Sequence, residues 1–353
     1  MSGTAMTGGV PDGLTVVIYH KKEEAYYVPA VLDGARWETV RRGQPGKFTF
    51  TVVWDDALKM ENGDTVDALW KGVQFFHGYI FEMKKQRNQG WQILAYDQIR
   101  YLKNKDTFSY IGKKASDVIK ELAEDYELTV GELADTGYVI PQRLEQNTAI
   151  IDMMLNALDI TMIQTKKLYV LYDDCGCLML KNLEDRQTNL LIDAETAQDW
   201  DYAVSIDKET YNLVKLIVDE EGSGQRAYYA PADNATYAES PTRKQWGVLQ
   251  YFESINPQGL VINPQQLAEQ YLAAYNRPTR SMSIRGAAGD LAVRGGAMLW
   301  LNITISDDAP SKIETISQAA SEARLIIAEK VTHTFSNHAD IMDLEVRGDE
   351  VQR

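Results

Sequence analysis

Cysteine is nearly absent from this sequence: Cys175 and Cys177 are the only 2 in 353 residues. Two neighbouring cysteines cannot build a disulfide framework, so we expect synthesis in a reducing cytoplasm. No apolar run approaches the ~20 residues that a membrane-spanning helix needs. The first ten residues have neither a basic leader nor an apolar core, so we expect no secretory signal. These absences predict a protein that does not insert into membranes.

Positive charge is also scarce, with 36 Lys+Arg against 51 Asp+Glu and a formal net charge of −15. A nucleic-acid backbone requires clustered Lys and Arg, so no nucleic-acid binding is expected. The acidic residues are unevenly distributed: residues 1–110 include 14 basic and 13 acidic residues, and the remainder of the chain includes 22 basic and 38 acidic residues. A near-neutral first part ahead of acidic parts favours a surface that meets other protein.

Patterns for metal binding or nucleophilic catalysis are missing. The four histidines form no H-x-x-x-H or H-E-x-x-H arrangement, which favours packed or surface roles over metal or base roles; they are His20, His77, His333 and His338. Cys175-Gly-Cys177 has no second pair or nearby His to complete four zinc ligands. Free thiols at a hairpin tip are therefore expected.

The glycine-rich segments and the adjacent acidic pairs are also better explained by turns and solvated surface charges than by catalysis. Gly286–Asp290 and Arg294–Gly296 are followed by strands rather than a helix N-terminus, which favours turns over a phosphate loop. Adjacent acids are normally solvated rather than set apart across a glycosidic bond; such pairs are Asp55–Asp56, Asp173–Asp174, Glu220–Glu221 and Asp307–Asp308. No Gly-x-Ser-x-Gly elbow is present. The sequence thus predicts no enzyme and identifies no catalytic, cofactor-binding or metal-binding residues.

The first third of the chain reads as β-structure. Short runs that alternate or are rich in β-formers predict strands separated by polar turns, typical of a small barrel or sandwich. The predicted strands are Leu14–Tyr19, Tyr26–Leu32, Lys47–Val53, Thr65–Trp70, Phe75–Met83 and Trp91–Tyr96.

A helical period begins after Tyr110. Apolar residues three or four apart predict helices at Ala115–Tyr126 and at Ala149–Leu158, the second with Thr148 as a possible N-cap. A hairpin of Leu168–Tyr172 and Cys177–Asn182 follows. After about Leu190 the β pattern returns, with strands at Leu213–Val218, Arg280–Arg285, Leu291–Val293, Met298–Ile305, Leu325–Phe335 and Ile341–Val346. Loops are expected at Gly222–Gly224 and Pro231–Pro241, and helices from Pro264 to Tyr275 and at Ser311–Ala323.

Several motifs, taken in order, resemble one family. They are Gly63–Val66, Phe76–Ile80, Ala95–Lys105, Ala115–Ile119, Thr148–Leu158, Ser205–Asn212, Val331–Phe335 and Met342–Glu345. In order and spacing they resemble the tail hub proteins of contractile phage tails. The resemblance is to the PBSX-prophage type, related to the late-control gene D group and also met in phage-tail-like bacteriocins. Asp307–Glu329, predicted to be an extra helix, departs from that pattern.

The resemblance implies an α+β, mostly β fold with two related small β-barrel domains flanking a mixed α/β middle domain. The boundaries would be residues 1–108, 109–200 and 201–353. It implies a homotrimer whose six similar barrels join a hexameric tail tube above to a trimeric spike below, alongside other baseplate and tape-measure proteins. Such a particle is assembled in the bacterial cytoplasm and released by lysis.

Two other function classes stay open from the residues alone: a tail-associated peptidoglycan hydrolase and a carbohydrate-binding adhesin. Five of the seven tryptophans could anchor an interface or an adhesin site, although barrel-core positions are favoured for most; these five are Trp37, Trp54, Trp70, Trp246 and Trp300.

Overall fold

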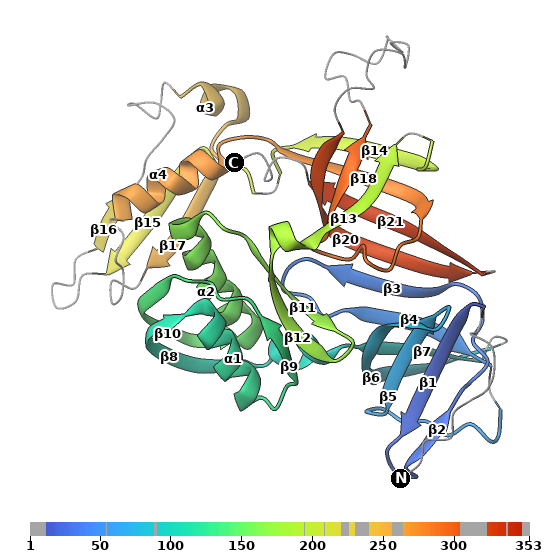
Figure 1. Ribbon diagram of the computed structural model, residues 1–353. Coiled ribbons are helices and arrows are strands. Elements are labelled where there is room, and N and C mark those ends of the chain that lie inside the picture. The colour runs from blue at the N-terminus through green and yellow to red at the C-terminus, as the bar shows by residue number, and fades with distance from the viewer. Residues whose placement is uncertain are drawn as a thin grey trace.

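The structure is a computed structural model, which describes residues 12–53, 55–87, 90–193, 195–207, 209–219, 226–229, 240–255, 264–303, 323–336 and 338–347. N-terminal and C-terminal strands stack on one side of the molecule. The mixed middle part and a smaller sheet-and-helix unit lie on the other side (Figure 1). In the described part, no helix is long and apolar enough to cross a membrane.

The N-terminal strands enclose an aromatic core. Alternation sets this core: in the strand Lys47–Val52, Phe48, Phe50 and Val52 are buried, while the residues between them are half-buried. The strands are β1 (Leu14–His20), β2 (Ala25–Tyr27), β3 (Ala35–Val40), β4 (Lys47–Val52), β5 (Thr65–Trp70), β6 (Val73–Gln86) and β7 (Gly90–Tyr96).

The C-terminal strands enclose a second, aliphatic core that includes Ile284, Leu299, Val331 and Leu344. The strands are β13 (Gln187–Asp193), β14 (Asp199–Ser205), β18 (Thr279–Ala288), β19 (Met298–Asn302), β20 (Arg324–Ser336) and β21 (Ala339–Arg347).

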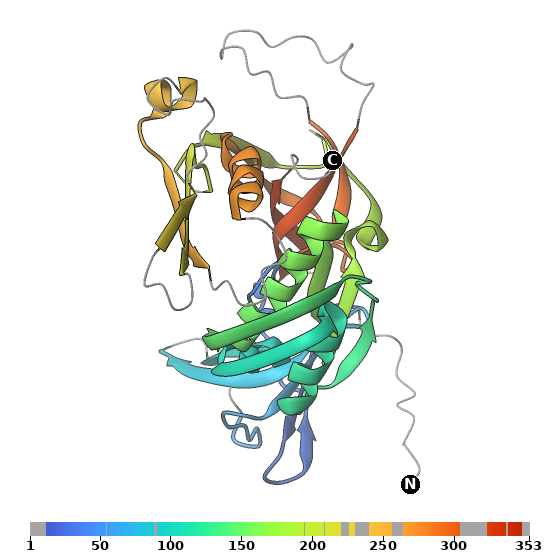
Figure 2. The same cartoon turned by 90° about the vertical axis from the view of Figure 1, so that its left-hand side faces the viewer.

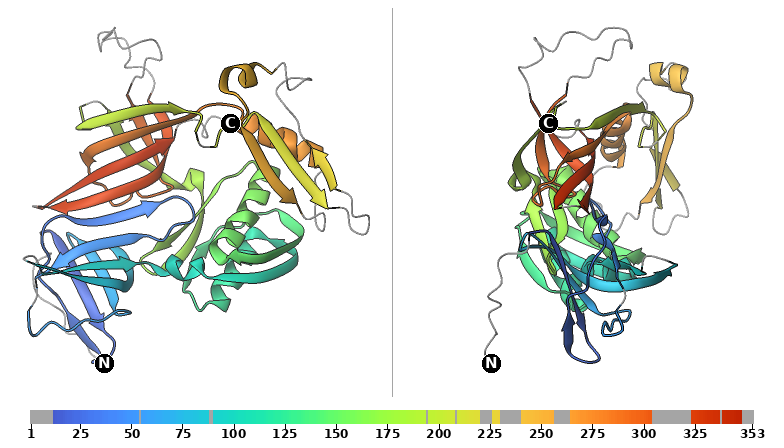
Figure 3. Two further views of the ribbon diagram at one scale, coloured as in Figure 1. Left: turned by 180° about the vertical axis from the view of Figure 1, so that it is seen from behind. Right: turned by 90° about the vertical axis from the view of Figure 1, so that its right-hand side faces the viewer.

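One continuous sheet connects the two cores. Strand β20 pairs antiparallel with β3 from Lys330↔Val40 to Phe335↔Ala35. Its first half packs in the aliphatic core, and Phe335 packs in the aromatic core. In Figure 3, the blue strand β3 therefore lies directly beside the red strand β20.

The expectation of closed barrels is wrong for the described residues. The sheet is open, with the order β14-β18-β21-β20-β3-β4-β7-β6-β5-β1-β2, and β13 and β19 branch from β20. A barrel closes only when the first and last strands of its own sheet pair with each other. Here the edge strand β3 of the N-terminal region pairs with β20 of the C-terminal region instead, which joins the two regions into one open sheet.

The middle part packs two helices against short sheets. Val118, Ile119 and Leu122 of the first helix bury one face, as their spacing predicts. The elements are η1 (Gln98–Lys103), β8 (Lys105–Lys114), α1 (Ala115–Asp125), β9 (Val130–Leu133), β10 (Val139–Ala149), α2 (Ile150–Thr165), β11 (Tyr169–Asp174), β12 (Cys177–Asn182) and η2 (Leu183–Arg186).

A smaller unit interrupts the C-terminal strands. Its helix α4 (Pro264–Tyr275) confirms the helix predicted from Pro264, and packs through Leu267, Ala268 and Leu272 on one face of a three-stranded sheet (Figure 2). The other elements are β15 (Leu213–Asp219), β16 (Arg226–Tyr229), α3 (Pro241–Trp246) and β17 (Gln250–Ile255).

Two predicted strands differ from the structure. The segment Tyr26–Leu32 is a strand only up to Tyr27, with one further isolated bridge at Val31↔Val52. Leu291–Val293 is not a strand, because a turn is closed there by the Val293 amide bonding to Asp290 O.

Two predicted helices also need correction. Helix α2 runs seven residues past Leu158, to Thr165, and its N-cap is Ala149 rather than Thr148. The helix expected across Asp307–Glu329 is wrong at its end, where Arg324–Glu329 opens strand β20. Residues 304–322 lie outside the described residues.

Loop boundaries shift as well. Pro241, expected at the end of a loop, begins α3, where the Ser240 hydroxyl accepts a hydrogen bond from the Arg243 amide. Gly286, read as part of a turn, belongs to strand β18 at φ 69°, beside a register shift in the pairing with β21. The expected loop at Gly222–Gly224 and residues 231–239 lie outside the described residues.

Candidate functional site

Three of the four histidines pair with aspartates. His20 Nδ1 lies 2.7 Å from Asp64 Oδ2, and His77 Nδ1 lies 2.7 Å from Asp67 Oδ1. His333 is fully buried, with Nδ1 3.0 Å from the Asp340 carboxylate. The packed role predicted for histidines holds for His20 and His333.

His338 has a different environment: it is an exposed residue at φ 64° whose Nδ1 bonds to the backbone oxygen of Asp12. This is the surface role that the sequence predicted as the alternative.

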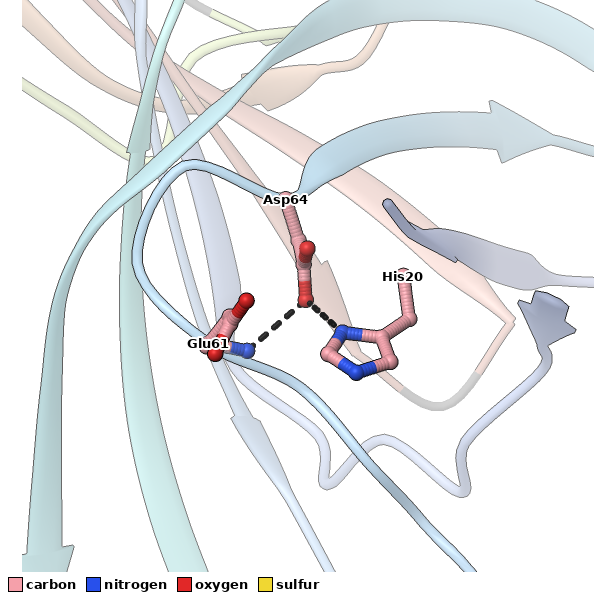
Figure 4. Close-up of side chains that lie close together, drawn as sticks. All are labelled: His20, Glu61 and Asp64. Atoms are coloured by element: carbon pink, nitrogen blue, oxygen red, sulfur yellow. Dashed lines mark hydrogen bonds and ion pairs between the residues drawn. The ribbon is translucent and has the colours of Figure 1, made fainter. Parts of the chain in front are cut away.

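In the described part of the chain, one group of three side chains could offer ligands to a metal ion: His20, Glu61 and Asp64 (Figure 4). However, both Asp64 oxygens already accept protein hydrogen bonds. The Lys21 amide donates to Oδ1 at 3.1 Å and the Glu61 amide to Oδ2 at 2.7 Å. The buried Asp64 therefore closes the turn before β5 onto the end of β1, and a metal would have to displace the bond from His20.

A second group of charges lies where the three parts of the chain meet; we call it the junction. Arg294, from the loop before β19, donates through Nη1 to Asp173 O at 3.1 Å and through Nη2 to Asp174 Oδ1 at 2.8 Å. Its guanidinium also lies over the rings of Trp37 and Tyr172, 5.6 and 5.3 Å from their centroids. One C-terminal side chain thus contacts both the N-terminal core and the middle hairpin.

The other side of the junction is built by the residues that follow β7. Asp97 is buried and accepts the Gly46 amide at 2.7 Å and the Ile99 amide at 3.0 Å, which fixes the start of η1. The neighbouring Gln98 donates to Asp173 Oδ2 at 2.7 Å. These bonds connect the N-terminal strands to the β11–β12 hairpin.

The junction raises the pKa values of its carboxyl groups. Burial raises the pKa of Asp173 to about 6, although bonds from the Gly176 amide and Gln98, and the charges of His77 and Arg294, act in the opposite direction. Burial, and then the charge of Asp173, raises the pKa of Asp97 well above its usual value. The two acids therefore oppose each other's ionisation inside one site.

Close backbone contacts complete the junction. A Cβ on Gly295 would lie 2.4 Å from Val40 C and 2.5 Å from Arg41 N, and the Gly295 amide donates to Thr39 Oγ1 at 2.9 Å. Glycine is required there because the loop lies directly against β3. This contact fixes the C-terminal loop to the N-terminal hairpin.

The β3–β4 hairpin also reaches both other parts of the chain. Arg41 Nε donates to Glu329 of β20 at 2.9 Å, and Arg42 pairs with Asp159 of α2. A small surface pocket between this hairpin and α2 is lined in part by Leu155, Leu158 and Met162.

The remaining candidates from the sequence are the two cysteines and the adjacent acidic pairs. Cys175 and Cys177 are free thiols at the β11–β12 turn, as predicted. Asp55 and Asp56 are exposed, as expected for solvated acids, whereas Asp173 lies in the junction and contradicts that expectation. Glu220, Glu221, Asp307 and Asp308 lie outside the described residues.

The tryptophans are only in part core residues. Trp37 and Trp70 are buried in the aromatic core, and Trp246 and Trp300 are half-buried. Trp54 lies outside the described residues.

The fold is that of phage tail proteins. The prophage MuSo2 43 kDa tail protein from Shewanella oneidensis matches 96% of this chain and 100% of its own, with a TM-score of 0.62 at 9% identity. A tail protein from Neisseria meningitidis MC58 matches 96% of this chain and 98% of its own, with a TM-score of 0.63 at 10% identity.

Sequence comparison then gives the family. A family model described as YQBQ-like matches residues 35–347, and the chain belongs to this family. The uncharacterized protein YqbQ of Bacillus subtilis (strain 168) is 30% identical over 256 residues, 70% of this chain and 74% of YqbQ. The phage-like element PBSX protein XkdQ of the same organism is 27% identical over 288 residues, 80% of this chain and 86% of XkdQ. The resemblance to PBSX-type tail proteins is therefore confirmed.

Proposed function

We propose that this protein is a structural baseplate hub of a contractile phage tail or phage-tail-like bacteriocin. Three copies would form a ring with six β units that joins a hexameric tail tube to a trimeric spike. Other baseplate and tape-measure proteins would complete the partners. The protein would act in the assembled particle, which forms in the bacterial cytoplasm and leaves by lysis.

The observation that carries this proposal is the pairing of β20 with β3. A three-fold ring can present six equivalent contacts only if each chain holds two β units at a fixed relative orientation. Backbone pairing along six residues of each strand, with one strand shared by two cores, supplies that rigidity. The division at residues 108 and 200 that the resemblance implies would assign most of these two units to the first and last domains, with β13 and the first residues of β14 falling before residue 201.

The junction supports the same role. The bonds from Arg294 and Gln98 to the β11–β12 hairpin hold the middle part against the β regions, and the Gly295 contact holds the C-terminal loop against β3. The Asp174 side chain of the Arg294–Asp174 ion pair is 41% exposed, so this pair adds little to stability, but its loss would leave the largely buried Arg294 guanidinium without its carboxylate partner. We therefore assign the junction a structural role rather than a catalytic one.

Native mass spectrometry and negative-stain electron microscopy of the purified full chain test the proposal. The expected result is a trimer with a central channel at micromolar concentration, and binding of the ring to tail tube and spike subunits. A chain that stays monomeric up to about 100 μM and also when mixed with those subunits would refute it. Peptidoglycan degradation by the purified chain would favour the hydrolase alternative.

A further inference from the structure

The solvent face of the long sheet carries a row of tyrosines at its N-terminal end. The register places Tyr26 opposite Tyr19, Tyr19 opposite Thr65, Thr65 opposite Tyr79, and Tyr79 opposite Tyr96. Directly opposed residues share one face of a sheet, and these lie on the face away from the aromatic core. Four tyrosines therefore stand on one face across five strands.

Two more rings and two cations extend this row. Tyr101 of η1 lies 5.6 Å from Tyr79 and 5.8 Å from Phe81, measured between ring centroids. Lys21 lies over Tyr79 at 4.9 Å, and Arg100 over Phe81 at 5.4 Å. We call the whole surface the tyrosine face; it comprises Tyr19, Lys21, Tyr26, Tyr79, Phe81, Tyr96, Arg100 and Tyr101.

This surface has the chemistry of an unfilled protein interface. Tyr26 is 71% exposed and Tyr101 37% exposed. No hydroxyl of its tyrosines hydrogen-bonds to another protein group in the part of the chain that the structure describes. Tyrosine and arginine are enriched at interface hot spots. Hydroxyl donors beside two cations fit a partner surface rich in carboxylates.

The other end of the same sheet face provides such carboxylates. The row continues from Tyr96 through Lys47, Glu38 and Thr332 to Asp343. Beside it, Asp201 and Glu345 both lie opposite Ser283. We call the group the carboxylate end; it comprises Asp199, Asp201, Asp343 and Glu345, all exposed. Arg285 pairs with Asp199 and Asp201, and Lys330 lies opposite Glu345, so these four acids outnumber the two cations beside them.

We propose that the tyrosine face of one copy binds the carboxylate end of a second copy. Two complementary and unlike patches on one chain make a head-to-tail contact, the kind that generates rings. The chain's own charge distribution favours this partner, because residues after 110 carry 22 basic against 38 acidic residues. This inference rests on the proposed hub ring and specifies the surfaces that close it.

Truncation of the tyrosines gives the first test. Tyr26→Ser combined with Tyr79→Ser is expected to raise the protein concentration for half-assembly at least about tenfold, measured by native mass spectrometry. The matched control is Ile111→Ser, which removes a 74% exposed side chain from β8 and is expected to leave assembly unchanged. Circular dichroism would check that each variant is folded.

A charge swap gives the second test. Lys21→Glu and Asp201→Lys are each expected to weaken assembly, and the two changes together to restore it. Lys120→Glu, an exposed position on α1, is the control. If wild type and both test variants assemble equally, the inference is wrong while the hub proposal stands. If wild type never assembles, both are wrong. Equal weakening by the control variants would also refute the inference.

Discussion

The carboxyl group of Asp173 offers the sharpest quantitative test of the junction. Its pKa is raised from an ordinary 3.8 to about 6, chiefly by burial. A carboxyl group whose pKa is higher in the folded than in the unfolded state stabilises the folded protein while it is protonated. This contribution is fully present below about pH 4 and is lost as the pH rises through about 6. Replacement by Asn removes this titration, so the difference between wild type and Asp173→Asn should depend on pH.

The size of that dependence follows from the shift. A difference of about 2 pKa units corresponds to about 3 kcal/mol, of which about 2 kcal/mol falls between pH 4 and pH 7. Wild type should therefore lose about 2 kcal/mol of unfolding free energy relative to Asp173→Asn over that interval. The variant also loses the hydrogen bond from Gln98, because the side-chain nitrogen of the new Asn would face the Gln98 side-chain nitrogen, and both are donors. That cost is the same at each pH.

Urea unfolding of both proteins at several pH values would measure this difference. Asp135→Asn is the control, because Asp135 is exposed and its bond with the Lys114 side chain lowers its pKa, so this change should show the opposite sign. Parallel pH profiles for wild type and Asp173→Asn would refute the reasoning, since they would mean that the Asp173 carboxyl group is hydrated in the folded protein.

Three further changes test the joining of the two β regions. Trp37→Ala should cost about 3–5 kcal/mol of unfolding free energy, and hydrogen exchange should show protection lost in both β regions, because Trp37 is buried and stacks on His333 of β20. Gly295→Ala should cost about 1–3 kcal/mol through its clash with the backbone of β3, measured by urea unfolding. Arg42→Ala should change the unfolding free energy by less than about 1 kcal/mol, because its ion pair is exposed; a larger loss would mean that this pair holds α2 in place.

Local patterns predicted the elements whose side chains follow a clear period. The alternation of Phe48, Phe50 and Val52 identified β4, and the spacing of Val118, Ile119 and Leu122 identified α1. Strands without a clean pattern were missed. β8 and β10 leave most of their side chains exposed or half-buried, so neither shows the alternation of a core strand.

The junction could be recognised only in fragments. Asp173–Asp174 and Arg294–Gly296 were both noticed as unusual sequences, but they are more than a hundred residues apart and each had an ordinary explanation alone. Asp97 and Gln98 gave no signal of burial, because a polar residue after a strand is typical of a surface turn.

The sequence by itself determined the family, the mostly β composition, the two free thiols and the negative net charge, because all of these depend on residue identity or on short-range periodicity. The tertiary structure decided that the two β regions form one open sheet, that β20 belongs to two cores, and that Asp173 lies half-buried beside Arg294. Those features depend on which distant strands pair and on how loops pack against them, and chain-local preferences do not specify such contacts.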